Sequence, residues 1–387
     1  MAMANPGVRV DSPLSTLLHR LASSEPRDSG VISLYLNLGP DQHGRGTHDV
    51  FLRRAFADQL KAAAGRPDTA DGLARAVARI EAFLANDVEP TAKAAAIFAS
   101  ADGDEFFEAV PLETPIDAHQ LFLGPVPHLF PLVRLIDQYP RYAALLLDTN
   151  QARIIVFGLG AVETREEVAG EKTRRHSMGG WSQARYQRRI GNLHLQHLKE
   201  VVETLERIVR DEAIDHVIVA GDAALVARLR EQLPVQLADK IVDAVRFDRN
   251  AGEHEIVDES MAALRRRDAQ DDSERVAEVI GAWRASGLGV AGPEATLRAL
   301  QLGQVDELLI AATPAILKAV QALPDDAAAA PSTAARSAPD GAEIAQLHLA
   351  DELVTRATQS GAAVRIIEDA ELLEDYGGVA AALRFRL

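Results

Sequence analysis

The sequence contains no cysteine among its 387 residues. Without thiols the chain can form no disulfide, zinc–thiolate site or iron–sulfur cluster and has no cysteine nucleophile, which suits the reducing cytoplasm. No stretch approaches the ~20 apolar residues that a membrane span needs, and the N-terminus lacks the charged and then apolar pattern of a signal peptide. We therefore expect a cytoplasmic protein without a membrane partner.

Basic residues are scarce relative to acidic ones. The 41 Lys and Arg against 57 Asp and Glu give a formal net charge of −16. A protein that wraps its whole surface in nucleic acid needs a net basic face, so this balance argues against that class, and we expect no DNA partner. A local basic segment is still compatible with this negative net charge. Aromatic residues make up only 5% of the chain against 47% hydrophobic residues, which favours aliphatic cores of helices packed on sheets.

The length corresponds to about two to four domains. The order of strand-like and helical segments predicts three consecutive α/β domains, at residues 1–138, 139–258 and 259–387. The first ends in a proline-rich passage through Pro125, Pro127 and Pro131. The last contains a segment rich in Pro, Ala and Ser at 323–342, which we expect to be a disordered insert.

The middle domain has the clearest pattern. Three strand-like runs at residues 142–168 are followed by a long helix, and then by a strand, a helix and a strand up to residue 247. This order predicts a mixed sheet with helices on its faces. Apolar or aromatic residues and one histidine recur along the long helix at steps of three or four, so one face should point to a core: Tyr186, Ile190, Leu193, His197, Val201, Leu205 and Ile208.

The segment 172–199 is basic, whereas the chain as a whole is acidic. It carries seven Lys and Arg residues and no acidic residue. Gly179 and Gly180 allow the backbone to approach a surface closely, and a helix that begins near Ser182 would favour an anion at its N-terminus. The residues suited to bind RNA phosphates are Arg174, Arg175, Ser182, Arg185, Arg188 and Arg189. The alternative is a surface loop followed by a solvated helix face.

The motif GGWSQARYQRR resembles the GGQ loop of archaeal and eukaryotic class-1 peptide-chain release factors. In that family the pattern is GGQSA, one variable residue and then Arg-Phe. Gly179, Gly180, Ser182 and Arg185 match it in register, and Tyr186 stands for the phenylalanine. Trp181 occupies the place of the catalytic glutamine, and the nearest glutamine, Gln183, lies two residues later. The bacterial release-factor-like branch, related to eukaryotic quality-control peptidyl-tRNA hydrolases, looks closer because the glutamine can be displaced within the loop there.

The last domain resembles the kink-turn-binding ribosomal-protein-type domain of release factors and pelota. This second resemblance is carried by residues 287–300, the strand-like DELLIA at 306–311 and the closing YGGVAAALRFRL at 376–387. In the family, this domain contacts a translational GTPase. The resemblance therefore implies such a GTPase as a partner, beside the ribosome.

The resemblance also implies a reaction. The family's loop enters the peptidyl-transferase centre and helps water attack the ester between peptide and tRNA. Gly179, Gly180, Trp181 and Gln183 then become the candidate catalytic residues, rRNA and peptidyl-tRNA the partners, and no metal or other cofactor is expected. Two alternatives are open: a hibernation factor that occupies the ribosomal A site without hydrolysis, favoured by Trp181, which is suited to stack on a base, and an RNA- or protein-binding scaffold.

Four other sequence features are weaker candidates for binding a ligand, a metal or RNA. A literal GxGxxG at 287–292 follows a helix, so its context does not fit dinucleotide binding. His194 and His197 lie three residues apart without an identifiable third metal ligand. A modest basic patch in the first domain, and the run 265–267 in a charged helical stretch, are each compatible with an RNA contact or with a solvated surface. The patch consists of His43, Arg45, His48, Arg53 and Arg54.

Overall fold

The structure, a computed structural model, describes residues 13–39, 48–63, 67–103, 106–169, 182–245, 252–318 and 341–386. They form three sheets covered by helices, which confirms the predicted mixed α/β class. By compactness the chain divides into two units. Tyr139–Asp271 belongs to one, here called the middle unit, and Gly7–Gln138 together with Asp272–Leu387 forms the other, the terminal unit.

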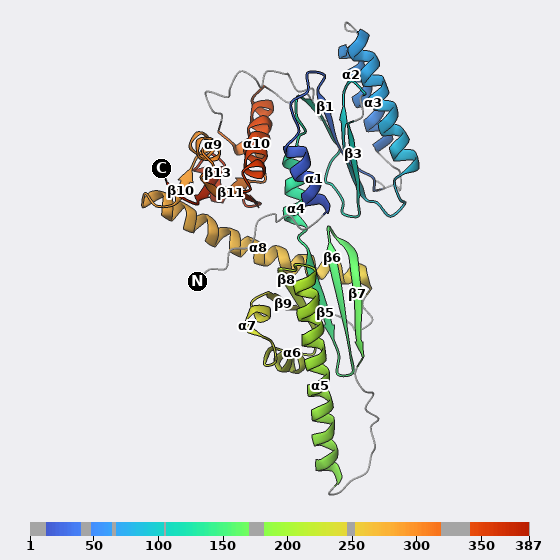
Figure 1. The fold of residues 1–387 in the computed structure, drawn as a ribbon, viewed down its shortest axis with the longest axis vertical. Coiled ribbons are helices and arrows are strands. Elements are labelled where there is room, and N and C mark those ends of the chain that lie inside the picture. The colour runs from blue at the N-terminus through green and yellow to red at the C-terminus, as the bar shows by residue number, and fades with distance from the viewer. Residues whose placement is uncertain are drawn as a thin grey trace. The chain divides into compact units, whose positions relative to one another are not determined.

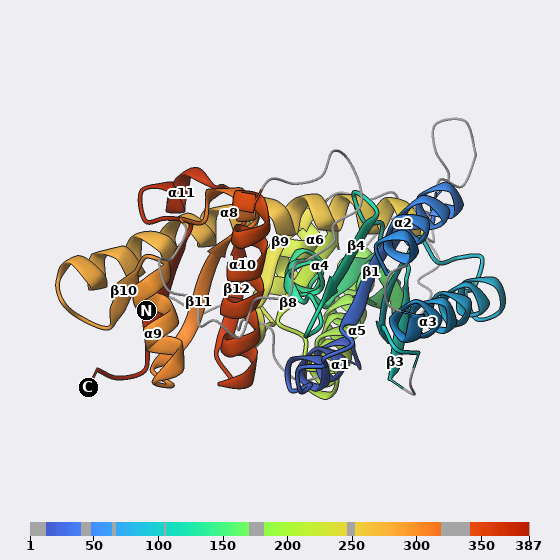
Figure 2. The same ribbon diagram turned by 90° about the horizontal axis from the view of Figure 1, so that it is seen from above.

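The first sheet of the terminal unit has the strand order β3-β2-β1-β4, and its neighbouring strands are antiparallel. The strands are β1 (Val31–Asn37), β2 (Ala94–Ser100), β3 (Phe107–Leu112) and β4 (Gln120–Gly124). Helices α2 (His48–Ala63) and α3 (Pro67–Asn86) lie side by side against this sheet (Figure 1; Figure 2), and their apolar residues share a core with β1 and β2. Helices α1 (Pro13–Ala22) and α4 (Phe130–Gln138) complete this part.

Two elements beside the proline-rich passage were not predicted from the sequence: β4, which ends just before Pro125, and α4, which contains Pro131. Strand β4 is only five residues long, too short for its alternation to be distinctive. Helix α4 has Pro131 in its first turn, where the missing N–H of proline removes no helical hydrogen bond. The prolines therefore mark the start of a helix rather than a structureless connection.

The second sheet of the terminal unit has the order β10-β13-β11-β12, in which only β11 and β12 are parallel. The strands are β10 (Gly289–Ala291), β11 (Val305–Ala311), β12 (Ala363–Ile367) and β13 (Val379–Leu383). Its helices are α9 (Pro293–Gln301), the 3-10 turn η1 (Pro314–Ile316), α10 (Gly341–Gln359), α11 (Glu371–Glu374) and the last part of α8 (Glu253–Arg284). Residues 323–340 of the expected insert lie outside the described residues, and α10 begins at its last two positions.

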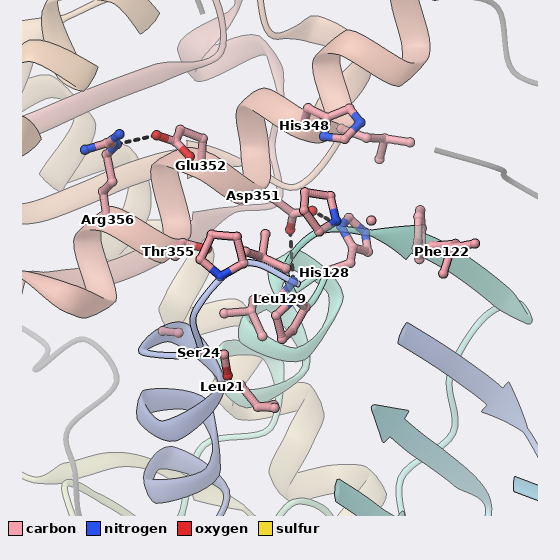
Figure 3. A pocket seen from close by; sticks show the side chains of 18 of the residues that line it. Leu21, Ser24, Phe122, His128, Leu129, His348, Asp351, Glu352, Thr355 and Arg356 are labelled. Carbon is pink, nitrogen blue, oxygen red and sulfur yellow. Dashed lines mark hydrogen bonds and ion pairs between the residues drawn. The ribbon is translucent and has the colours of Figure 1, made fainter. Parts of the chain in front are cut away.

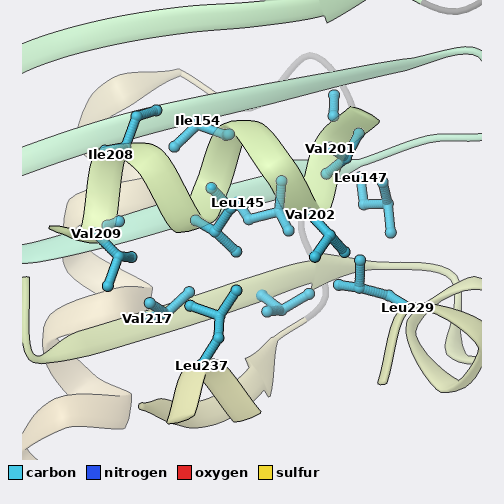
Figure 4. Close-up of a cluster of buried hydrophobic side chains, with 14 of the residues drawn as sticks. Leu145, Leu147, Ile154, Val201, Val202, Ile208, Val209, Val217, Leu229 and Leu237 are labelled. Atoms are coloured by element: carbon cyan, nitrogen blue, oxygen red, sulfur yellow. The ribbon is translucent and has the colours of Figure 1, made fainter. Parts of the chain in front are cut away.

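The sheet of the middle unit has the order β7-β6-β5-β8-β9. Strands β5 (Tyr142–Leu147), β6 (Gln151–Gly158) and β7 (Ala161–Ala169) are antiparallel, whereas β8 (His216–Gly221) and β9 (Ile241–Val245) run parallel to β5. One face packs against α5 (Ser182–Asp211), α6 (Ala223–Arg230) and α7 (Val235–Ala238) (Figure 4), and the other packs against the first part of α8. Both faces of β5 are buried, as its unbroken apolar sequence predicts.

Candidate functional site

Helix α5 begins at Ser182, where the sequence predicted the helix to start. Gly179, Gly180 and Trp181, which directly precede it, lie outside the described residues, as do Arg174 and Arg175. A helix N-terminus has unpaired N–H groups and a positive dipole end, both of which favour anions. The GG sequence is therefore joined to an element that attracts phosphate or a developing oxyanion.

The first half of α5 projects from the middle unit beyond the edge of the core (Figure 1). None of the side chains at 191–196 is buried, and from position 191 on the first buried ones are His197 and Leu198. At 1.5 Å per residue, the fifteen positions 182–196 correspond to about 22 Å of helix. The N-terminus of α5, at Ser182, thus lies away from the body of its own unit.

The second half of α5 anchors this projection. Val201, Leu205 and Ile208 pack against β5, β6 and β8 in one aliphatic core (Figure 4). Together with His197 they confirm the buried part of the predicted helix face, while Leu193 is half-buried and the side chains of Tyr186 and Ile190 lie outside the described residues. Arg207 adds a polar contact, because its guanidinium donates to Glu166 of the edge strand β7 at 2.6 Å.

Charge changes sign along the same helix. The basic segment ends at Lys199, and the buried half that follows carries Glu200, Glu203, Glu206 and Asp211 against Arg207 and Arg210. The net charge is thus positive up to Lys199 and negative in the rest of the helix. A polyanion is attracted to the positive part and repelled from the anchoring half.

Five of the predicted site residues lie in the first turns of α5. The backbone places Ser182, Gln183, Arg185, Arg188 and Arg189 in helical conformation. Helical spacing puts positions 182, 185 and 189 on one face, with 188 beside them. The arrangement can present several phosphate-binding positions along one side of the helix.

His197 lies where the helix leaves the core. It is 4% exposed. Burial lowers the pKa of His197 below its usual value, although the nearby Glu200 opposes this. Among the residues that the structure describes, no three His, Asp or Glu side chains are grouped so that they could hold a metal ion, so His194 and His197 gain no third ligand there.

The two weaker basic regions are solvent-facing where they are described. Arg53 and Arg54 are exposed on α2, and His48 is half-buried at its start; His43 and Arg45 lie outside the described residues. In the run 265–267, all three arginines are exposed, Arg266 lies 3.3 Å from Asp243, and Arg267 lies 3.0 Å from Asp271. The run therefore has acidic partners within its own unit.

Comparison with known families identifies the class. Residues 127–265 match the model of bacterial archaeo-eukaryotic release factor family 10, and residues 271–387 match the model of eRF1 domain 3. The chain belongs to the superfamily of release-factor-like proteins of the archaeal and eukaryotic type. No curated protein sequence matches it.

Several solved structures align with nearly the whole chain at low identity. Archaeal translation termination factor aRF1 is 19% identical over 96% of this chain and 97% of its own, with a TM-score of 0.26. Pelota of Archaeoglobus fulgidus is 14% identical over 100% and 99%, with a TM-score of 0.35. A model of ribosome-bound archaeal Pelota and ABCE1 is 15% identical over 98% and 96%, with a TM-score of 0.43. Within the described residues, no helix is both long and apolar enough to cross a membrane.

Proposed function

We propose that this chain is a ribosome-binding, release-factor-like protein that presents residues 179–183 to the peptidyl-tRNA end in the peptidyl-transferase centre. There it hydrolyses the ester between peptide and tRNA, in ribosome rescue or in termination. The observation that carries the proposal is the start of α5 at Ser182, directly after the GG sequence, on a helix half that leaves the core of its unit. The match of residues 127–265 to a bacterial release factor family supports it.

The chemistry needs little from protein acids and bases. A narrow site walled by RNA admits a slim backbone, which Gly179 and Gly180 supply. Peptide N–H groups ahead of a helix N-terminus, including that of Trp181, are suited to stabilise the oxyanion that forms when water attacks the ester. Gln183 is the nearest side chain with both a donor and an acceptor for positioning that water.

Binding to rRNA is assigned to the basic positions around this loop. Arg174 and Arg175 precede it, while Arg185, Arg188 and Arg189 follow it in the first turns of α5. Guanidinium groups bind phosphate with two parallel hydrogen bonds, so these positions favour a backbone contact that is independent of sequence.

A second function is favoured by Trp181. An indole at the glutamine position is bulkier than an amide and stacks on any nucleobase, for about 1 to 3 kcal/mol. On this alternative the protein occupies the A site of idle ribosomes without hydrolysis, as a hibernation factor. In both cases the expected contact for a translational GTPase is the segment 271–387, which matches eRF1 domain 3.

The test combines ribosome pelleting with single-turnover release of labelled peptide from stalled ribosomes. The wild type is compared with a Gly179→Val/Gly180→Val variant. Binding with release that the variant loses supports hydrolysis, and binding without release supports the A-site occupant. Absence of pelleting would overturn both functions and favour a scaffold outside the ribosome.

A further inference from the structure

A cavity of about 390 Å³ lies within the terminal unit, between α1, the connection from β4 to α4, and α10 (Figure 3). Its walls are mostly apolar and include Phe122, Val126 and Leu347. Pockets that bind small molecules have volumes of about 300 to 1,000 Å³ and combine apolar walls with a few placed polar groups. The cavity is large enough for such a ligand.

The polar centre of the cavity is His128. Asp351 of α10 holds its ring, because one carboxylate oxygen meets Nδ1 of His128 (Figure 3). The other carboxylate oxygen accepts hydrogen bonds from the backbone N–H groups of Leu129 and Phe130, both at 3.0 Å, at the start of α4. Three donors therefore fix the carboxylate, and the carboxylate fixes the imidazole.

The backbone of His128 is fixed as well. Its N–H donates to the hydroxyl of Ser33 at 2.9 Å, and its carbonyl accepts from the hydroxyl of Tyr35 at 2.6 Å. Burial, followed by the charge of Asp351, raises the pKa of Tyr35 well above its usual value, so this hydroxyl keeps its proton. The imidazole is held in one orientation before any ligand arrives.

One atom of this arrangement has no partner. Nε2 of His128 is buried and makes no hydrogen bond among the described residues, in a side chain that is 6% exposed. An ionised carboxylate only accepts hydrogen bonds, so the neutral ring carries its proton on Nδ1, which leaves Nε2 as an acceptor. A buried acceptor without a donor is unfavourable, and a ligand that supplies an N–H removes this deficit.

The charges of the lining favour a neutral ligand. Arg356 is paired with Glu352 of the same helix, and Asp351 is already satisfied by three donors. Burial lowers the pKa of His348, the other histidine in the wall, below its usual value. The lining thus offers neither an unpaired cation for an anion nor a free carboxylate for an amine.

We propose that this cavity binds a neutral, planar heteroaromatic molecule that donates an N–H hydrogen bond to Nε2 of His128. The ring of Phe122 lies against the imidazole, with centroids 3.6 Å apart and planes inclined by 40°, so an aromatic wall adjoins the acceptor. Flat aromatic molecules gain from packing on such a ring. The site is separate from the GG segment in sequence and in chemistry.

The probes are indole and benzofuran, which have the same shape but differ in one N–H. Titration of the full-length protein, followed by ligand-observed NMR and calorimetry, is expected to give a dissociation constant for indole about tenfold lower than for benzofuran, the difference that one buried hydrogen bond makes. No measurable binding of indole, or equal binding of the two probes, would overturn the proposal.

Two substitutions locate the binding. Thr355, half-buried in α10, lines the cavity, so Thr355→Trp should fill it and raise the dissociation constant of indole at least tenfold, whereas Thr355→Ser should leave binding unchanged. His128→Asn keeps a donor for Asp351 but has no acceptor at the Nε2 position, so it should remove the preference for indole over benzofuran. Undiminished binding to a folded Thr355→Trp variant would place the probe elsewhere, which decides the question even if His128→Asn does not fold.

Discussion

Arg365 donates a hydrogen bond from Nε to Glu307 at 2.9 Å, and the two residues are only 6% and 5% exposed. They belong to the parallel neighbours β12 and β11, and α8 adds Asp272 and Arg275 to the same network. Removing one member of a buried ion pair leaves the others without compensation, which costs about 3 to 5 kcal/mol. The network therefore ties the last part of α8 to the C-terminal sheet.

Arg365→Met should accordingly lower the free energy of unfolding of the terminal unit by about 3 kcal/mol. The matched control is Arg20→Met, which removes an exposed pair with Glu108 in the same unit and should cost less than about 0.5 kcal/mol. Urea unfolding followed by circular dichroism measures both. Equal shifts of the two unfolding midpoints would contradict the structural role of the buried pair.

Substitutions in the two halves of helix α5 should differ sharply in their effect on the stability of the middle unit. Leu205 is 0% exposed in the core of the middle unit, and Leu195, ten residues earlier, is 41% exposed. Leu205→Ala should destabilise the unit by about 2 to 5 kcal/mol, because it leaves a cavity in a packed core. Leu195→Ala should change stability by less than about 0.5 kcal/mol. A large loss from Leu195→Ala would mean that the first half of the helix is packed after all.

The stability of the middle unit should fall as the solution becomes acidic, in part because of His197. Burial lowers the pKa of this histidine in the folded state, so below the unfolded value of about 6.5 the unfolded chain binds a proton that the folded chain does not. The stability contributed by the neutral ring is complete above that pH. Below that pH this contribution to stability is lost, at no more than about 1.4 kcal/mol per pH unit.

The measurement is chemical unfolding at pH 7.5, 6.5 and 5.5. His197→Leu should weaken the dependence of stability on pH, whereas His254→Leu, at a position 82% exposed on α8, should leave it as in the wild type. Parallel pH profiles for the wild type and His197→Leu would exclude His197 as the source.

How far the sequence predicted the fold depended on the length of each pattern. Strand β5 and helix α5 have long apolar runs or a long periodic face, and both lie where the sequence predicted them. Strand β4 and helix α4 were missed because they are short and lie among prolines. Local periodicity contains too little information in five to nine residues.

The cavity at His128 could not be predicted from the sequence. Asp351 lies more than two hundred residues after the histidine that it orients, and neither residue belongs to a recognisable motif. Only the folded terminal unit brings α10 against α4. The GG segment illustrates the opposite case, because its chemistry is visible in sequence and the structure adds the projecting helix behind it.

The basic positions of α5 should control binding to the ribosome. Arg185→Glu together with Arg188→Glu should abolish pelleting with ribosomes and leave the melting temperature unchanged, since these positions lie on the half of the helix that leaves the core. Arg228→Glu with Arg230→Glu, at exposed positions of α6, changes the net charge equally and should preserve binding. Unchanged sedimentation of the first variant would exclude docking through α5.

The residue that positions water can be separated from the residues that bind RNA. If Gln183 orients the attacking water, Gln183→Ala should slow single-turnover peptide release by about 100-fold or more at unchanged ribosome affinity, because positioning acts on the chemical step rather than on docking. The control is Gln187→Ala, which changes the next glutamine along the same helix and should release peptide at the wild-type rate. Equal rates for the wild type and Gln183→Ala would leave the backbone around Gly179 and Gly180 as the source of any hydrolysis, and Trp181→Gln would then test whether the indole limits it.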